Sequence, residues 1–188
     1  MILFKIGQLG NCWLLAATSG LASRPELFQH VVPSDFDQGQ GFEVGIFHFR
    51  FWRYGEWIDV VVDDRLPTID GKLFLNKSDN ENEFWPALLE KAYAKIHGSY
   101  AALEGGFTRD GFLDFSGACL EYFNFNIEIP DNLFDTLYKA NQLMALMACS
   151  TPGKDQGKTN RHGLVPGHAY TITKVIKLKH EGLSNTVC

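Results

Sequence analysis

The sequence lacks the features that mark several specialised classes of protein. No apolar run approaches the ~20 residues that a membrane-spanning helix needs, so we expect no transmembrane segment. The formal net charge is −5, which gives no basic excess to attract nucleic acid. Internal repeats and low-complexity stretches are also absent. These absences favour a globular protein that binds neither nucleic acid nor a bilayer.

Cysteine is scarce and scattered. The four cysteines are Cys12, Cys119, Cys149 and Cys188, and none of them forms a C-x-x-C pair. Neither a zinc site nor a disulfide framework is therefore indicated.

Aromatic residues, by contrast, are abundant. The chain has 15 Phe, 6 Tyr and 4 Trp, and hydrophobic residues make up 45% of it. With 188 residues, this composition predicts one good-sized domain or two small lobes that share a core.

Hydrophobic periodicity predicts the main elements of the first half. A helix is expected over residues 12–22, with Gly10 and Asn11 supplying a turn and a cap before it. Alternating Phe47, Phe49 and Phe51 predict a strand over residues 42–52, and a turn then leads into a second strand over 56–67, so a hairpin is expected. Residues 70–76 are expected to form a turn and a short extended piece.

A second helix is expected over residues 84–100, with Pro86 in its first turn and Gly98 near its end. Its predicted apolar face consists of Trp85, Leu88, Leu89, Ala92 and Ile96. Residues 103–112 are expected to be a loop whose Gly105-Gly106 pair divides two lobes. A helix over 133–149 and a strand over 168–179 follow in the prediction.

The run around Cys12, GQLGNCWLLAATSGLA, allows three interpretations: a signal peptide, a buried structural thiol or a nucleophile. Lys5 and the small residues at the end of the run have the general form of a signal peptide. However, Gly7, Gln8, Gly10 and Asn11 interrupt the apolar core that a signal peptide requires.

A cysteine nucleophile needs a lowered thiol pKa and a histidine partner from elsewhere in the fold. A helix N-terminus supplies the first, and Cys12 is expected at such a terminus. Among the six histidines, His168 is the best candidate partner because it opens a strand directly after Gly167. We expect structural roles or solvated surroundings for the others, which are His30, His48, His97, His162 and His180.

Several blocks of the sequence resemble the protease core of the calpain family. They are LGNCWLLAA, GIFHFRFWRYGEWIDVVVDDRLP, NEFWPALLEKAYAKIHGSYAALEGG and VPGHAYTIT, and they occur in the family's order over roughly residues 7–177. Calpains are intracellular, calcium-dependent cysteine endopeptidases. Their core is papain-like, with a helical lobe that carries the cysteine and a β-rich lobe that carries the histidine and an asparagine.

The resemblance implies roles for particular residues. Cys12 matches the nucleophile and His168 the general acid/base, while Gly106 and Gly167 match glycines whose backbone binds an extended substrate peptide. Glu83 matches a ligand of Ca²⁺, the implied cofactor. Without the resemblance, Glu83 would be read as an acidic residue that favours a helix N-terminus.

The chain also departs from the family pattern. Ile6 stands where the family has the glutamine that donates to the oxyanion, and either Leu3 or no residue stands where it has an aspartate ligand of calcium. The family's catalytic asparagine, in an N-P-W-G context, has no counterpart, since the context of Asn185 does not match. We therefore expect a truncated β lobe.

Together these observations predict an α+β, papain-like fold with two lobes, a helical lobe over residues 1–106 and a partial β-rich lobe over 107–188. The predicted function is calcium-dependent endoproteolysis of protein substrates in the cytoplasm by a Cys–His mechanism, with the protease core incomplete in this polypeptide. The sequence does not tell whether a regulatory subunit binds. The alternative is a catalytically impaired homologue that binds peptides or partners without cutting them.

Overall fold

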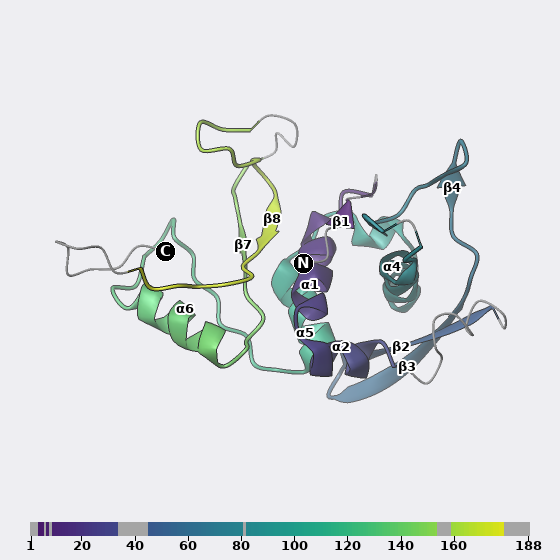
Figure 1. The fold of residues 1–188 in the computed structure, drawn as a ribbon, viewed down its shortest axis with the longest axis horizontal. Coiled ribbons are helices and arrows are strands. Elements are labelled where there is room, and N and C mark those ends of the chain that lie inside the picture. Colours follow the sequence, from purple (N-terminus) through teal and green to yellow (C-terminus); the bar gives the residue numbers. More distant parts are fainter. Residues whose placement is uncertain are drawn as a thin grey trace.

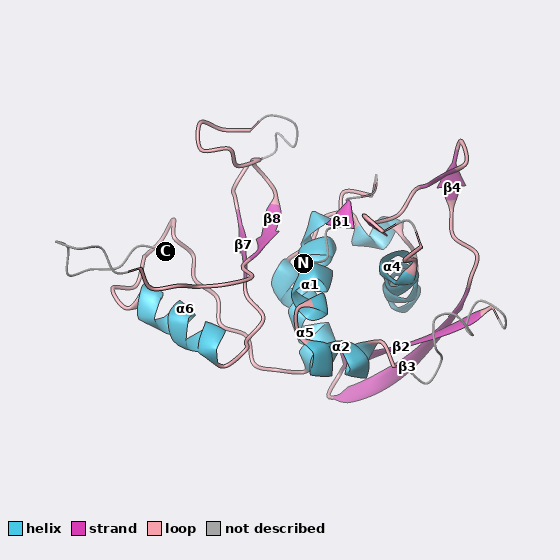
Figure 2. Cartoon of the chain, viewed as in Figure 1, coloured by secondary structure: helices cyan, strands magenta, loops and turns pink. Residues whose placement is uncertain are grey.

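The computed structural model describes residues 4–5, 7, 9–33, 45–80, 82–153 and 159–178. The chain contains both helices and strands, which occur in groups along the sequence (Figure 2). The elements are β1 (Phe4–Lys5), α1 (Cys12–Ala22), α2 (Pro25–Val31), β2 (Ile46–Arg53), β3 (Glu56–Asp63), β4 (Thr68–Ile69), β5 (Lys72–Leu73), β6 (Lys77–Ser78), α4 (Trp85–His97), η1 (Ala101–Leu103), α5 (Thr108–Ser116), α6 (Leu133–Gln142), β7 (Ala148–Ser150) and β8 (Ala169–Thr171).

The helix α1 lies in the middle of the molecule (Figure 1). On one side of it lie α4 and the long β2–β3 hairpin, and on the other side lie β7, β8 and, beyond them, α6. Among the described residues the strands pair only two by two, as β1–β6, β2–β3, β4–β5 and β7–β8. The fold is therefore mixed α and β, as predicted, and is built around a helix rather than a large sheet.

The hairpin follows the predicted pattern. Its antiparallel register runs from the pair Ile46–Asp63 to the pair Arg53–Glu56. Phe47, Phe49 and Phe51 are all buried, because alternate side chains of a strand point to one face. The second strand ends at Asp63 rather than at 67, and the predicted start of the first strand, residues 42–44, lies outside the described residues.

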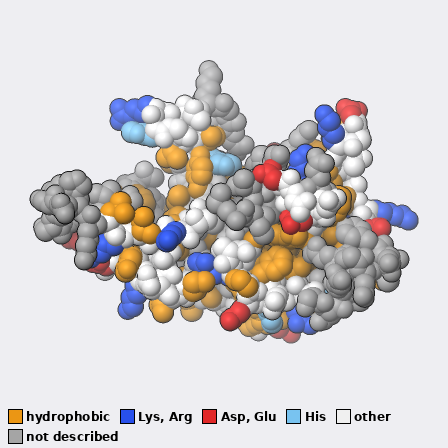
Figure 3. All heavy atoms as spheres, viewed as in Figure 1, with side chains coloured by type: hydrophobic (Ala, Val, Ile, Leu, Met, Phe, Trp, Pro, Cys, Tyr) orange, Lys and Arg blue, Asp and Glu red, His pale blue; other side chains and the backbone are white. Residues whose placement is uncertain are grey.

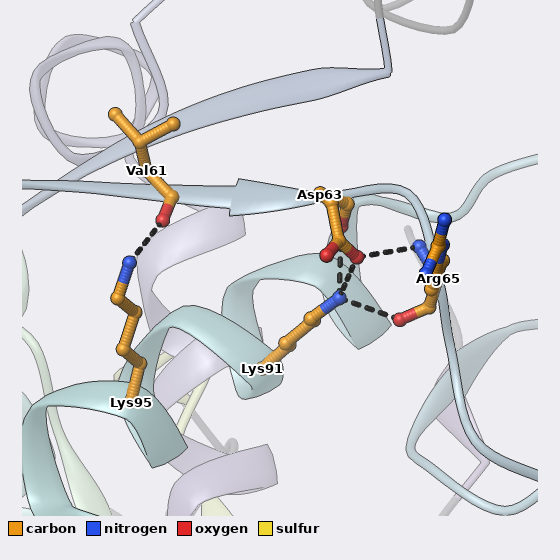
Figure 4. A network of polar contacts seen from close by, with 5 residues as sticks. All are labelled: Val61, Asp63, Arg65, Lys91 and Lys95. Atoms are coloured by element: carbon orange, nitrogen blue, oxygen red, sulfur yellow. Dashed lines mark hydrogen bonds and ion pairs between the residues drawn. The ribbon is translucent and has the colours of Figure 1, made fainter.

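Two lysines fasten α4 to the end of β3 (Figure 4). Lys91 Nζ donates to the carboxylate of Asp63 and to the carbonyl oxygens of Asp63 and Arg65. Lys95 Nζ donates to the carbonyl oxygen of Val61 over 2.7 Å. These contacts lie on the solvent side of a helix whose other faces are buried, so they fix its direction along the hairpin.

The prediction for α4 is confirmed in position and corrected in burial. The helix spans Trp85–His97 and ends at Gly98 in a left-handed conformation. All residues from Trp85 to Glu90 are buried, and so are Ala92, Tyr93 and Ala94. The helix is therefore enclosed on more than one face, whereas its sequence periodicity indicated a single apolar face.

Residues 103–112 are only partly the loop that the sequence predicts, since η1 ends at Leu103 and α5 begins at Thr108. The helix α5 packs against α1 and β2. The division of the chain at Gly106 stays a prediction, and α5 beyond it contacts the core of the first part.

Two predicted elements of the second half are shorter than expected. The helix predicted over 133–149 ends at Gln142, because Met144 has a φ of 60° and residues 148–150 pair with β8. The strand predicted over 168–179 is regular only over Ala169–Thr171, the length of its described partner β7.

The second part of the chain is poorly enclosed over its described residues. No residue of α6 is buried, and hydrophobic side chains reach the surface over and beside this helix (Figure 3). Such exposure fits a partial lobe. No helix in the described part of the chain has the length and apolar character to cross a bilayer.

Phe51 is the residue whose loss should damage the core most clearly. Its ring is fully buried and contacts Tyr93 and Phe115 at centroid distances of 5.4 and 6.0 Å. We expect Phe51→Ala to lower the free energy of unfolding by about 3–5 kcal/mol in urea titrations. Val61→Ala, on the exposed face of the same hairpin, should change it by about 0.5 kcal/mol or less. Equal losses in the two variants would contradict this assignment of the core.

Candidate active site

Cys12 is the first residue of α1, as predicted, and it is 8% exposed. The helix behind it is part of the core, since Leu14, Ala17 and Leu21 are all buried. This burial favours the structural and nucleophile interpretations over the signal peptide, because the segment is built into the folded protein. The thiol therefore lies at the end of a helix that the core holds fixed.

Asn11 occupies the N-cap position of α1, but its side chain does not cap the helix. Its backbone carbonyl accepts hydrogen bonds from Leu14 N and Leu15 N over 3.0 and 3.2 Å. The side chain points away from the helix and donates through Nδ2 to Glu90 Oε1 over 2.5 Å. The predicted cap is thus correct in position and wrong in its side-chain bond.

Glu90 is a buried carboxyl group directly behind the loop that leads to Cys12. It is 1% exposed and comes from the middle of α4. Its Oε1 accepts the bond from Asn11, and its Oε2 accepts one from the backbone N–H of Asn76 over 2.7 Å. Burial raises the pKa of Glu90 to about 7, against the opposing effect of these two hydrogen bonds.

Asn76 extends this network to Gly7, ahead of the nucleophile. Gly7 N donates to Asn76 Oδ1 over 2.8 Å, and Asn76 Nδ2 donates to Asn11 Oδ1 over 3.4 Å. Gly7 also lies so close to the backbone of Phe74 and Leu75 that an added Cβ would come within 2.5 Å of Phe74 O. Sequence reasoning missed Glu90 and Asn76. The available signal was a charged residue, Glu90, on the same helix face as the small Ala87 and Ala94.

Gly106 lies beside the nucleophile's neighbour, Trp13. A Cβ on Gly106 would lie 2.5 Å from the Trp13 indole, so only glycine fits at this position. Gly105 N donates to Gly10 O over 3.3 Å, and Trp13 Nε1 donates to Leu103 O over 2.9 Å. These contacts hold the backbone at Gly106 close to the N-terminus of α1.

His168 precedes β8 at a turn that Thr151 organises. Gly167 N donates to Thr151 O over 3.1 Å, and Thr151 N donates to His168 O over 3.0 Å. The imidazole packs edge-on against Tyr170 at a centroid distance of 4.9 Å. No described residue forms a hydrogen bond with its ring nitrogens, so the imidazole is not committed to a structural partner.

The strand after His168 lies against the helix that carries Cys12. Thr171 Oγ1 donates to Ala16 O over 2.7 Å, one turn into α1, and Ala169 belongs to the same core cluster as Cys12. The fold therefore brings the two candidate catalytic elements side by side (Figure 1). Cys12 and His168 do not hydrogen-bond to each other among the described contacts.

A cavity of about 590 Å³ opens beside Gly106. Its lining includes Trp13, Gly106 and the buried Asp114. Although burial alone would raise the pKa of Asp114, the nearby His97 ring, the hydrogen bond from Tyr93 and the charge of Arg53 lower it below its usual value. The cavity therefore combines an aromatic wall with a paired, ionised carboxylate.

Glu83, the expected calcium ligand, has local partners for both carboxylate oxygens. Ser78 Oγ donates to Oε2 over 2.7 Å, and Asn80 Nδ2 donates to Oε1 over 3.3 Å. Among the described residues, no group of three acidic, histidine or cysteine side chains converges as a metal site would require. Calcium takes six to eight oxygen ligands, so Glu83 would need further oxygen donors to hold the ion.

Several residues singled out by sequence have other outcomes. His48 contacts Asp59 over 2.6 Å and His97 lies 3.9 Å from Asp114, which supports the expectation of structural roles. Leu3, Ile6 and Asn185, at the departures from the family pattern, lie outside the described residues. So do His180 and Cys188.

A cysteine at the start of a buried helix and a histidine directly before a strand that contacts this helix are compatible with the arrangement of a cysteine protease. Comparison with known proteins agrees. The chain matches the profile described as "Calpain family cysteine protease" over residues 3–187. It is 51% identical to calpain-A of Drosophila melanogaster over 90% of this chain and 20% of that protein.

Two mammalian relatives give the same result. Identity is 48% to the calpain-2 catalytic subunit of Bos taurus and 47% to calpain-8 of Mus musculus, in each case over 94% of this chain and 25% of the relative. The chain belongs to the calpain family of cysteine proteases. It spans about a fifth to a quarter of the length of these relatives.

The raised pKa of Glu90 predicts a pH-dependent stability. Folded Glu90 keeps its proton up to about pH 7, whereas in the unfolded chain it releases the proton near pH 4.5. The free energy of unfolding should therefore fall as pH rises through this window. Between about pH 4.5 and pH 8 we expect the protein to lose about 3 kcal/mol relative to Glu90→Gln, measured by urea titration. If both proteins responded to pH in parallel, the ionisation of Glu90 would not be coupled to folding.

Proposed function

We propose that this chain is the nucleophile-bearing part of a calcium-dependent cysteine endopeptidase, with Cys12 as nucleophile and His168 as general acid/base. The observation that carries the proposal is the hydrogen bond from Thr171 to Ala16. It joins the strand after His168 to the helix that begins at Cys12. The fold thus supports a role for these two residues in one reaction.

The proposed chemistry follows from the residue types. The Cys12 thiolate attacks the scissile carbonyl carbon, and the π electrons move to the carbonyl oxygen. The backbone N–H of Cys12 donates to that oxyanion. As the tetrahedral intermediate collapses, protonated His168 gives its proton to the leaving amine, and water later hydrolyses the thioester.

The substrate is proposed to be a protein bound as an extended peptide along the backbone of Gly106 and Gly167. The close packing of Gly106 on Trp13 supports this role, because it fixes a backbone segment that has no side chain of its own beside the start of α1. The cavity beside Gly106 is a suitable place for one substrate side chain.

Calcium dependence and a cytoplasmic location are proposed from the resemblance to calpains. Glu83 is the only proposed ligand among the described residues, and it needs additional oxygen donors to hold the ion. One relative is named as a catalytic subunit, so co-purification is the test for a partner subunit of this chain.

The burial of the thiol favours a second candidate function. Cys12 is only 8% exposed, and a protein that holds its thiol out of reach could bind a peptide at Gly106 without cutting it. In that case a labelled peptide would bind to the wild type and to Cys12→Ala equally, and neither protein would hydrolyse it.

Thiol reactivity tests the proposed nucleophile directly. Cys119 and Cys149 are exposed, whereas Cys12 is buried. If exposure governed reactivity, iodoacetamide would therefore label Cys119 first. We expect Cys12 to be alkylated at least about 10-fold faster than Cys119 near neutral pH, because a cysteine at a helix N-terminus with a histidine partner is more nucleophilic than an ordinary surface thiol. Peptide mass spectrometry gives both rates.

Hydrolysis of a fluorogenic peptide amide completes this test, with Cys12→Ala as the inactive control. Cleavage that survives Cys12→Ala, or equal alkylation of Cys12 and Cys119, would refute the proposed nucleophile.

Calcium binding by this chain should be weak. One carboxylate with two neutral neighbours supplies too few oxygen ligands, so we expect a dissociation constant of about 1 mM or weaker by calorimetry. Glu83→Gln should abolish the remaining heat, while Glu26→Gln, on the exposed start of α2, should not. A micromolar site would contradict this prediction.

A further inference from the structure

Asn11 is placed to cap α1 and does not do so. An Asn at the N-cap normally accepts a hydrogen bond from the second or third helical N–H, which belong here to Trp13 and Leu14. The cap bond satisfies one of the free donors at the helix start and places a partial negative charge there. A protease that uses this helix start for an oxyanion needs the opposite: free donors and positive potential.

The contacts of Glu90 explain why the cap is missing. Its carboxylate faces two donors, Asn11 Nδ2 at 2.5 Å and Asn76 N at 2.7 Å. A carboxylate has only acceptors, so it draws the NH₂ end of the Asn11 amide toward α4. The Asn11 Oδ1 atom is then engaged by Asn76 Nδ2 at 3.4 Å rather than by the helix.

The three side chains of this network are buried together, and burial strengthens the hydrogen bonds that hold Asn11 away from the helix. Asn11, Asn76 and Glu90 are each at most 3% exposed, so water does not compete for their polar groups. The backbone N–H groups of Cys12 and Trp13, in contrast, have no acceptor among the described residues.

We propose that Glu90 is a positioning residue of this site, whose buried carboxylate holds the Asn11 side chain away from the N-terminus of α1 and so keeps the N–H groups of Cys12 and Trp13 open to the substrate's carbonyl oxygen. The inference rests on the proposed function, and it assigns a role to a residue outside the reacting groups. Glu90 touches neither substrate nor thiol, so it acts only through Asn11.

Two reagents separate this role from a general effect on the thiol. A peptidyl aldehyde adds reversibly to Cys12: the sulfur bonds to the carbonyl carbon and the π electrons move to the oxygen, which then needs the N–H donors. Iodoacetamide alkylates the same sulfur by displacing iodide and forms no oxyanion. Loss of the open N–H donors should therefore lower the affinity for the aldehyde and leave the rate of alkylation by iodoacetamide nearly unchanged.

The decisive variants are Glu90→Gln, Asn11→Asp and the double variant. In Glu90→Gln, the new amide offers only one acceptor to two donors, which frees Asn11 to cap the helix. In Asn11→Asp, the new carboxylate is repelled by Glu90 toward the helix N-terminus and caps it. In the double variant, the amide at position 90 can donate to the carboxylate at position 11 and accept from Asn76. The donor–acceptor match then returns with the charge moved to position 11.

At about pH 8, where Glu90 is mainly ionised, each single variant should weaken the aldehyde by about 10- to 100-fold, a fraction of the cost of deleting an oxyanion donor. The iodoacetamide rate should change by less than about 3-fold. The double variant should recover most of the aldehyde affinity, a coupling that a double-mutant cycle measures.

Tyr100→Phe is the matched control. The pKa of Tyr100 is raised to about 12, first by burial and then by the charge of Glu90, so its hydroxyl lies near that carboxylate. The hydroxyl has no hydrogen-bond partner among the described residues. This variant should leave the aldehyde dissociation constant and the iodoacetamide rate constant unchanged.

Melting temperatures show which variants are folded at the assay temperature. Where a single variant unfolds, the double variant still tests the inference.

The outcomes distinguish the inference from the proposed function. If the wild type binds the aldehyde and folded Glu90→Gln binds it equally well, the inference is overturned and the proposed function stands. The inference is also overturned if a folded double variant binds the aldehyde as weakly as the single variants do. It is overturned as well if the single variants lower the aldehyde affinity and the iodoacetamide rate by the same factor. If the wild type neither binds the aldehyde nor is alkylated at Cys12, the proposed function fails and the inference fails with it.

Discussion

The burial of α1 is the constraint on which the rest of the structure depends. The helix packs against α2, α5, β7 and β8, so it is held from several directions at once. Its first residue is Cys12, and the backbone N–H groups of Leu14 and Leu15 close the first turn on Asn11 O. A helix enclosed in this way cannot rotate without breaking the core. The direction of the thiol and of the helix N-terminus is therefore set by packing rather than by local caps.

Two locally unfavourable features lie at that N-terminus. A carboxylate at Glu90 is buried without a cationic partner among its described contacts, and a helix begins without a side-chain cap. Replacing such a carboxylate with an apolar group of similar shape would often stabilise a protein. Each feature persists because the surrounding core determines the geometry more strongly than the local preferences do. Local conflicts of this kind are concentrated at functional sites.

The sequence predicts much of the fold because its patterns are local. The alternation of Phe47, Phe49 and Phe51 and the start of α1 at Cys12 need no knowledge of distant residues. The family resemblance adds the candidate pair Cys12 and His168, whose roles stay predictions. The sequence alone could not show that Asn11 bonds to Glu90, 79 residues away, in place of its own helix. Long-range contacts also explain why the helix predicted to reach residue 149 stops early: residues 148–150 pair with β8 instead.

The surroundings of the two catalytic candidates, Cys12 and His168, differ in how tightly they are packed. Cys12 belongs to a core of aromatic and aliphatic side chains, whereas beyond Phe115 the only buried hydrophobic residues among those described are Met147, Ala169 and Val175. The strand after His168 is tied to α1 by Thr171, and Arg24 holds the turn after α6 through the carbonyls of Met144 and Ala145. A few polar contacts of this kind contribute little compared with a core. Small rearrangements between Cys12 and His168 should therefore come from movement of the histidine side, while α1 stays fixed.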